Sequence, residues 1–98
     1  MIKHSVMFRF KGEGESKEKN TLFFKDKLEA LKNKIPEATY LETGVNFSES
    51  PSAFDLVLTT HFNSENDLDV YRKHPEHKKL VVLIKDLVTE VTVVDYSV

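Results

Sequence analysis

The order in which two hydrophobic periodicities follow each other limits the possible folds of this chain more than any other feature. Apolar and polar residues alternate, as in half-buried strands, in four segments: residues 2–10, 39–47, 54–62 and 88–96. Helical spacing of apolar residues separates the first segment from the second and the third from the fourth. The sequence therefore predicts the order β-α-β-β-α-β.

The first helix is predicted to span Lys17–Lys34. Its apolar residues recur at spacings of four, three and four, which places them on one stripe: Phe24, Leu28, Leu31 and Ile35. Ser16 is a suitable N-cap for this helix. Pro36 ends it, because the residue before a proline is disfavoured in the helical conformation.

The second helical segment is predicted to be interrupted. Ser64 is expected to cap it, with Asp67 at the third helical position. The pair His74-Pro75 then breaks the helix and starts a new one, since proline suits the first position of a helix. The apolar stripe continues after the break with Leu80, Ile84 and Leu87.

This order is typical of the ferredoxin-like α+β fold, in which two β-α-β crossovers interleave into one antiparallel sheet. We expect one domain over residues 1–98, with both helices on one face of the sheet. The other face should then be bare, and alternation assigns to it four apolar residues: Met7, Val57, Val91 and Val93. Exposed apolar faces of this kind are typical of interfaces, and two sheets packed face to face about 10 Å apart would bury it. The sequence thus predicts a homodimer through the open sheet face.

The composition narrows the classes of partner and of chemistry. The chain has 98 residues and a net charge of −2, so it lacks the basic excess of a nucleic-acid-binding protein. It contains no cysteine, which excludes disulfides, thiol catalysis and thiolate metal sites. Neither a secretory signal nor an apolar run of membrane-spanning length is found. We therefore expect a cytoplasmic protein without nucleic-acid or membrane partners.

One segment is unusual: Tyr71-Arg72-Lys73-His74-Pro75-Glu76-His77. It resembles the Tyr-x-x-His-Pro-x-His signature of the stress-responsive dimeric α/β-barrel family, abbreviated Dabb. The opening residues 2–11, the helix ending at Ile35-Pro36 and the final Val93-Val94-Asp95-Tyr96 also resemble this family, so the likeness covers nearly the whole chain. It implies a homodimer whose two sheets form a shared barrel, with the helices outside.

The resemblance does not imply a single activity. The family includes plant stress proteins, bacterial members of unknown role and a plant cyclase that folds a linear polyketide into an aromatic acid without a cofactor. The chain is similar to that cyclase at His4, Tyr71 and His77, and the likeness implies that His77 is the general base and that Tyr71 assists. It departs at Leu56 and Lys27, where the cyclase has a pocket histidine and a pocket tyrosine. These departures argue against polyketide cyclisation and leave one acid/base pair.

The residues themselves allow two interpretations of this pair. If Pro75 is the first residue of its helix, His77 lies in the first turn, where the helix dipole favours a neutral imidazole. A neutral imidazole beside the Tyr71 hydroxyl could accept a proton from a substrate. The alternative is that His77 only hydrogen-bonds the helix junction. His4 is either a satisfied core histidine or a pocket residue, and His74 has a structural role at the junction.

We therefore expect a pocket between the sheet and the helices, with His77, Tyr71 and His4 as catalytic residues. The expected ligand-binding residues are Phe24, Leu28, Leu56 and His74. Apolar walls suit a small aromatic or carbonyl compound, and the expected chemistry is cofactor-free proton transfer in an isomerisation, cyclisation or lyase reaction. We expect no metal, because no carboxylate has ligand-like spacing with the histidines. The alternative function is a non-catalytic, stress-related structural dimer.

Overall fold

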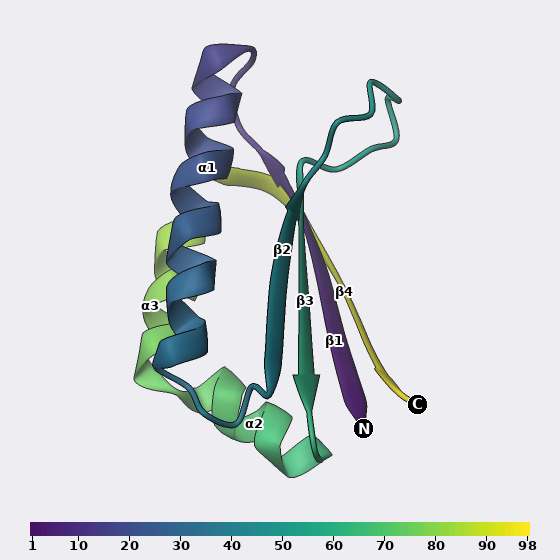
Figure 1. The fold of residues 1–98 in the computed structure, drawn as a ribbon. Helices are drawn as coiled ribbons and strands as arrows, with labels where there is room; N and C mark the ends of the chain where they lie inside the picture. The colour runs from purple at the N-terminus through teal and green to yellow at the C-terminus, as the bar shows by residue number, and fades with distance from the viewer.

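The elements of the chain follow the predicted order in the computed structural model, which describes residues 1–98 (Figure 1). The strands are β1 (Ile2–Phe10), β2 (Tyr40–Val45), β3 (Leu56–Phe62) and β4 (Val88–Ser97). The helices are α1 (Glu15–Ala30), which continues as a 3-10 turn over Leu31–Asn33, α2 (Glu65–Lys73) and α3 (Pro75–Ile84). All strand pairs are antiparallel, in the order β2-β3-β1-β4, so the ferredoxin-like α+β fold is confirmed.

The core lies between one face of the sheet and the helices. Figure 1 shows α1 and α3 side by side over this inner face, while the opposite, outer face carries no helix. The inward residues of β1 and β3 are buried, as alternation predicts: Val6, Phe8, Phe10, Leu56, Leu58 and Phe62. The predicted stripe, which begins in α1 and ends just after the 3-10 turn, packs against them, and none of its four residues exceeds 3% exposure: Phe24, Leu28, Leu31 and Ile35.

The first helix begins earlier than predicted. Its N-cap is Gly14, whose φ of 57° is a conformation that glycine adopts at little cost, and no side chain caps it. Ser16 lies inside α1, so its prediction as the N-cap is wrong. The cap of α2 is confirmed, since the Ser64 hydroxyl oxygen accepts a hydrogen bond from the Asp67 amide at 3.1 Å.

The register between β1 and β4 shows that one part of the predicted outer face is wrong. Val91 lies opposite Phe8, and Val93 lies opposite Val6. Directly opposed residues of an antiparallel pair point to the same face of the sheet. Both valines therefore face the helices rather than the bare side of the sheet.

A bulge near the start of β4 is the physical reason. Val88 pairs with Phe10, but the next pair along β1 joins Arg9 to Glu90, so β4 contains one extra residue at Thr89. The extra residue reverses the alternation that starts at Val88. The exposed apolar residues of the outer face are instead Met7, Val57, Val94 and Tyr96, together with Tyr40 on β2.

The second strand is shorter than the alternation predicts. Alternation over residues 39–47 predicts Leu41, Val45 and Phe47 on one face, but in the structure only Leu41 is buried, and Phe47 is 99% exposed. The strand ends at Val45, and the chain leaves the sheet in a projecting loop (Figure 1) held by asparagine and serine turns. None of the helices combines the length and the hydropathy that a membrane span requires.

Candidate functional site

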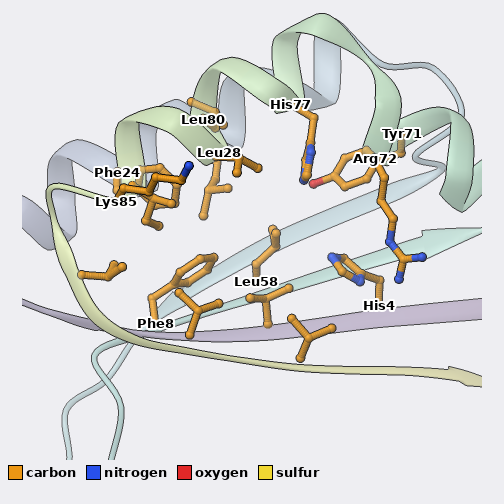
Figure 2. A pocket seen from close by; sticks show the side chains of 16 residues that line it. His4, Phe8, Phe24, Leu28, Leu58, Tyr71, Arg72, His77, Leu80 and Lys85 are labelled. Atoms are coloured by element: carbon orange, nitrogen blue, oxygen red, sulfur yellow. The ribbon is translucent and has the colours of Figure 1, made fainter.

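A cavity of about 610 Å³ lies between the inner face of the sheet and the helices (Figure 2). Phe8 and Leu58 line it from the sheet, Phe24 and Leu28 from α1, and Leu80 from α3. Twelve of its sixteen lining residues are hydrophobic, when Tyr71 is counted among them for its ring. This volume and this character are typical of sites for small, mostly apolar molecules.

Four polar side chains gather at one end of the cavity, near the junction of α2 and α3: His4, Tyr71, Arg72 and His77. Figure 2 shows the Tyr71 hydroxyl directed toward the His77 ring. The centroids of these two rings are 4.6 Å apart, and the His4 ring centroid is 5.9 Å from that of Tyr71. The expected acid/base residues are therefore neighbours in space.

The helix break brings this group together. His74 leaves the helical conformation, with ψ of 135°, and so ends α2. Its Nδ1 then accepts a hydrogen bond from the Glu76 amide at 3.1 Å and caps α3, with Pro75 as the first helical residue. The chain turns at this point, so that His77 in the first turn of α3 lies against Tyr71 in the last turn of α2.

Tyr71 is completely buried, and its hydroxyl has no hydrogen-bond partner within the protein. Burial raises the pKa of the Tyr71 phenol above its ordinary value, because the charged phenolate is disfavoured away from water. The hydroxyl therefore stays protonated over the physiological range, and it is free to donate a hydrogen bond.

His77 is half-buried, and its Nδ1 is buried without a hydrogen-bond partner in the protein. Burial lowers the pKa of His77 below 6.5, the backbone carbonyl of Arg72 opposes this effect, and the neighbouring charges of His4, Arg72 and His74 lower the pKa further. The imidazole is thus neutral near pH 7, as the position of His77 in the first turn of α3 predicts. A neutral imidazole with a free nitrogen can accept a proton.

His4 is held by Asp95, and Asp95 is held in turn by Arg72; sequence reasoning identified neither of them as a site residue. Its Nδ1 hydrogen-bonds one oxygen of Asp95 on β4, and the other oxygen of Asp95 accepts a hydrogen bond from the Arg72 guanidinium. The carboxylate favours a hydrogen on Nδ1 of His4 and so leaves Nε2 as the free nitrogen. The position of Asp95 opposite His4 in the β1–β4 register was the signal that could have identified it.

One family model matches the chain over nearly its whole length. The model of the stress responsive A/B barrel domain, Dabb, covers residues 2–98. The chain belongs to the Dabb family. It is 28% identical over 97 residues to an uncharacterised protein of Streptomyces coelicolor, and the match covers 99% of both chains.

Solved structures share the fold of this chain. A dimeric protein of unknown function with a ferredoxin-like fold, from Bacteroides fragilis, is 27% identical, with a TM-score of 0.88 over 99% of this chain and 95% of that one. The hydroxynitrile lyase of Passiflora edulis has a TM-score of 0.81 over 99% of this chain and 92% of that one. At 16% identity, this second likeness shows the fold alone.

Five of the seven residues predicted for the site line the cavity: His4, Phe24, Leu28, Tyr71 and His77. Two of these five, Tyr71 and His77, belong to the Dabb signature. The other two residues predicted for the site lie elsewhere. Leu56 is buried in the core, and Leu58, two residues later, lies in the cavity wall instead. His74 does not line the cavity, because its ring caps α3. No group of three or more histidine and carboxylate side chains is arranged to hold a metal ion.

Proposed function

We propose that the cavity binds a small, mostly apolar molecule with a carbonyl or phenolic oxygen, and that Tyr71 and His77 exchange a proton with it. The observation that carries this proposal is the pair of buried polar atoms, Tyr71 Oη and His77 Nδ1, that have no partner in the protein. A buried polar atom without a partner costs about 1–3 kcal/mol. A ligand hydroxyl between the two atoms would accept a hydrogen bond from Tyr71 Oη and donate one to His77 Nδ1, and a carbonyl oxygen would accept from Tyr71 Oη, whereas a purely apolar ligand would do neither.

The chemistry follows from the protonation states. Tyr71 would donate a hydrogen bond to the ligand oxygen, and neutral His77 would take a proton from the adjacent carbon or from a hydroxyl. When a C–H proton moves to Nδ1, the electron pair of that bond forms an enolate, whose charge the Tyr71 hydrogen bond stabilises. Return of the proton at another atom completes an isomerisation, and loss of a leaving group completes a lyase reaction. His4, fixed by Asp95, would orient the ligand or donate to it.

Two observations support the choice of reaction class. The cavity wall is apolar, so hydrogen bonds to a developing negative charge are stronger there than in water. The Passiflora edulis protein, which has the same fold, is named a hydroxynitrile lyase. Proton transfer of the lyase class is therefore within the range of reactions that this fold supports, although fold alone does not determine function.

The chain would act as a homodimer. Its outer sheet face exposes a contiguous apolar set that no element covers: Met7, Val57, Val94 and Tyr96. A second copy packed face to face would bury this set, and the similar Bacteroides fragilis protein is dimeric. The same face also supports the second candidate function, in which the protein acts as a stable, non-catalytic dimer and the signature residues only determine the fold.

A thermal-shift screen separates the two functions. Small phenolic, quinone and carbonyl compounds are added to the wild type, to His77→Ala and to Tyr71→Phe. The matched control is Lys78→Ala, at an exposed residue of α3 that does not line the cavity. Binding to the native state at 100 times Kd adds about 2.7 kcal/mol of stability. Catalytic use of the site predicts compounds that stabilise the wild type and Lys78→Ala but neither cavity variant. No hit in the wild type, together with a large loss of stability in His77→Ala, would favour the structural dimer.

A further inference from the structure

The charges that line the cavity all have the same sign. The chain has more acidic residues than lysines and arginines, 16 against 14. Nevertheless, no aspartate or glutamate lines the cavity, while two cationic side chains do, those of Arg72 and Lys85. A cavity that has low-dielectric walls and carries only positive charges in its lining attracts anionic ligands.

The two cations differ in their availability. Arg72 is already paired, since its guanidinium contacts the carboxylates of Asp95 and Asp69. Lys85 has no carboxylate within 4.0 Å, so its ammonium group is the lining cation that remains free to bind a ligand. The ligand-binding charge is therefore expected at Lys85.

Lys85 and the acid/base pair lie at opposite ends of the cavity. Figure 2 shows Lys85 beside Phe24, away from His77 and Arg72. Lys85 follows His77 by eight positions along α3 and its C-cap, which corresponds to about 12 Å along a helix. The wall between the two ends is apolar, with Phe24, Leu28 and Leu80.

We propose that the ligand of this cavity is an elongated amphipathic anion, of the medium-chain or arylalkanoic carboxylate class. Its carboxylate pairs with Lys85, its hydrocarbon part fills the apolar middle, and its far end reaches Tyr71 and His77. The inference rests on the proposed function, because it takes the same cavity as the binding site. It adds the charge, the length and the orientation of the bound molecule.

The test uses three probes with the same chain and different charge: decanoate, decanamide and decylamine. Their dissociation constants are measured by calorimetry for the wild type, for Lys85→Gln and for Lys78→Gln. Lys78 is an exposed α3 lysine without an ion pair that does not line the cavity, so it is the matched control. The wild type should bind decanoate about fivefold more tightly than decanamide, as expected for a partly exposed ion pair, and decylamine more weakly than either.

Lys85→Gln should remove the preference for decanoate and leave the affinity for decanamide unchanged, whereas Lys78→Gln should retain the preference. High salt should reduce the preference in the wild type. Equal affinities for decanoate and decanamide, tighter binding of decylamine, or no binding of decanoate would each overturn the inference. None of these outcomes would remove the proposed function, which depends on the phenolic and carbonyl screen with the Tyr71 and His77 variants.

Discussion

His4 on β1 lies directly opposite Asp95 on β4, and the two side chains are hydrogen-bonded across the ladder. The His4 side chain is only 7% exposed and that of Asp95 is 26% exposed. The second carboxylate oxygen accepts a hydrogen bond from Arg72 on α2. This one carboxylate therefore connects the edge strand, the central strand and the helix that carries Tyr71.

Replacing Asp95 by asparagine should destabilise the protein. The substitution keeps the shape but removes the charged acceptor that His4 and Arg72 share, and loss of such a partner costs about 1–3 kcal/mol. Urea unfolding measures the change. Asp69→Asn is the matched control, because Asp69 also contacts Arg72 but is 57% exposed and 3.9 Å away, and it should change stability by less than about 0.5 kcal/mol. Equal effects of the two variants would contradict a structural role of the His4–Asp95 pair.

The stability of the protein should depend on the protonation of His77. Because burial lowers its pKa in the folded state below 6.5, the unfolded chain binds more protons at this residue as the pH falls below that value. The free energy of unfolding should therefore decrease as the pH falls through this window, and the His77 contribution should level off below the folded-state pKa. His77→Gln should have a weaker pH dependence over the same range. An NMR titration of the His77 ring with a midpoint at or above 6.5 would contradict the burial argument.

Two valines of β4 provide a test of which sheet face forms the dimer. Val94 lies on the outer face with Met7 and Val57, whereas Val91 faces the cavity, and their exposures are similar at 54% and 45%. Val94→Glu should dissociate the dimer, because an unpaired charge in an apolar interface is costly. Val91→Glu should leave the assembly intact and weaken ligand binding. Sedimentation velocity distinguishes an 11.3 kDa particle from one of twice that mass. Dissociation by Val91→Glu alone would reverse the face assignment.

Two serines near helix starts should differ in their contribution to stability. The hydroxyl of Ser64 accepts a hydrogen bond from the Asp67 amide, while Ser16 lies within α1 and caps nothing. Ser64→Ala should cost about 1 kcal/mol, which lowers the Tm of a domain of this size by about 4–8 °C. Ser16→Ala should change the Tm little. A larger loss in Ser16→Ala would mean that α1 begins at Ser16 after all.

The fold was predictable because each element has its own signal. The alternation in β1, the stripe from Phe24 to Ile35 and the break at His74-Pro75 each determine one element without reference to the others. The faces of β4 were not predictable, because β-branched residues occur on both of its sides and the bulge at Thr89 has no local signature. A shift of one residue exchanges the two faces of a strand.

The candidate site was predictable only in part for the same reason. The signature identified Tyr71 and His77, and alternation placed His4 on the inner face. Asp95 becomes a neighbour of His4 only through the register of two strands that are 91 residues apart at this pair. Leu58 rather than Leu56 lines the cavity, and alternation does not distinguish the two, because both point to the inner face of the sheet.

The most direct test of the central claim compares two tyrosine–histidine pairs in one spectrum. Tyr71 and His77 face the cavity, Tyr40 and His61 stack on the outer face, and the ring centroids are 4.6 Å apart in both pairs. In protein with carbon-labelled tyrosine and histidine, addition of a phenolic or carbonyl compound that stabilises the wild type should shift the ring signals of Tyr71 and His77. The signals of Tyr40 and His61 should not move. Shifts confined to Tyr40 and His61, or no shift of the cavity pair at saturating ligand, would contradict the proposal that Tyr71 and His77 bind the substrate.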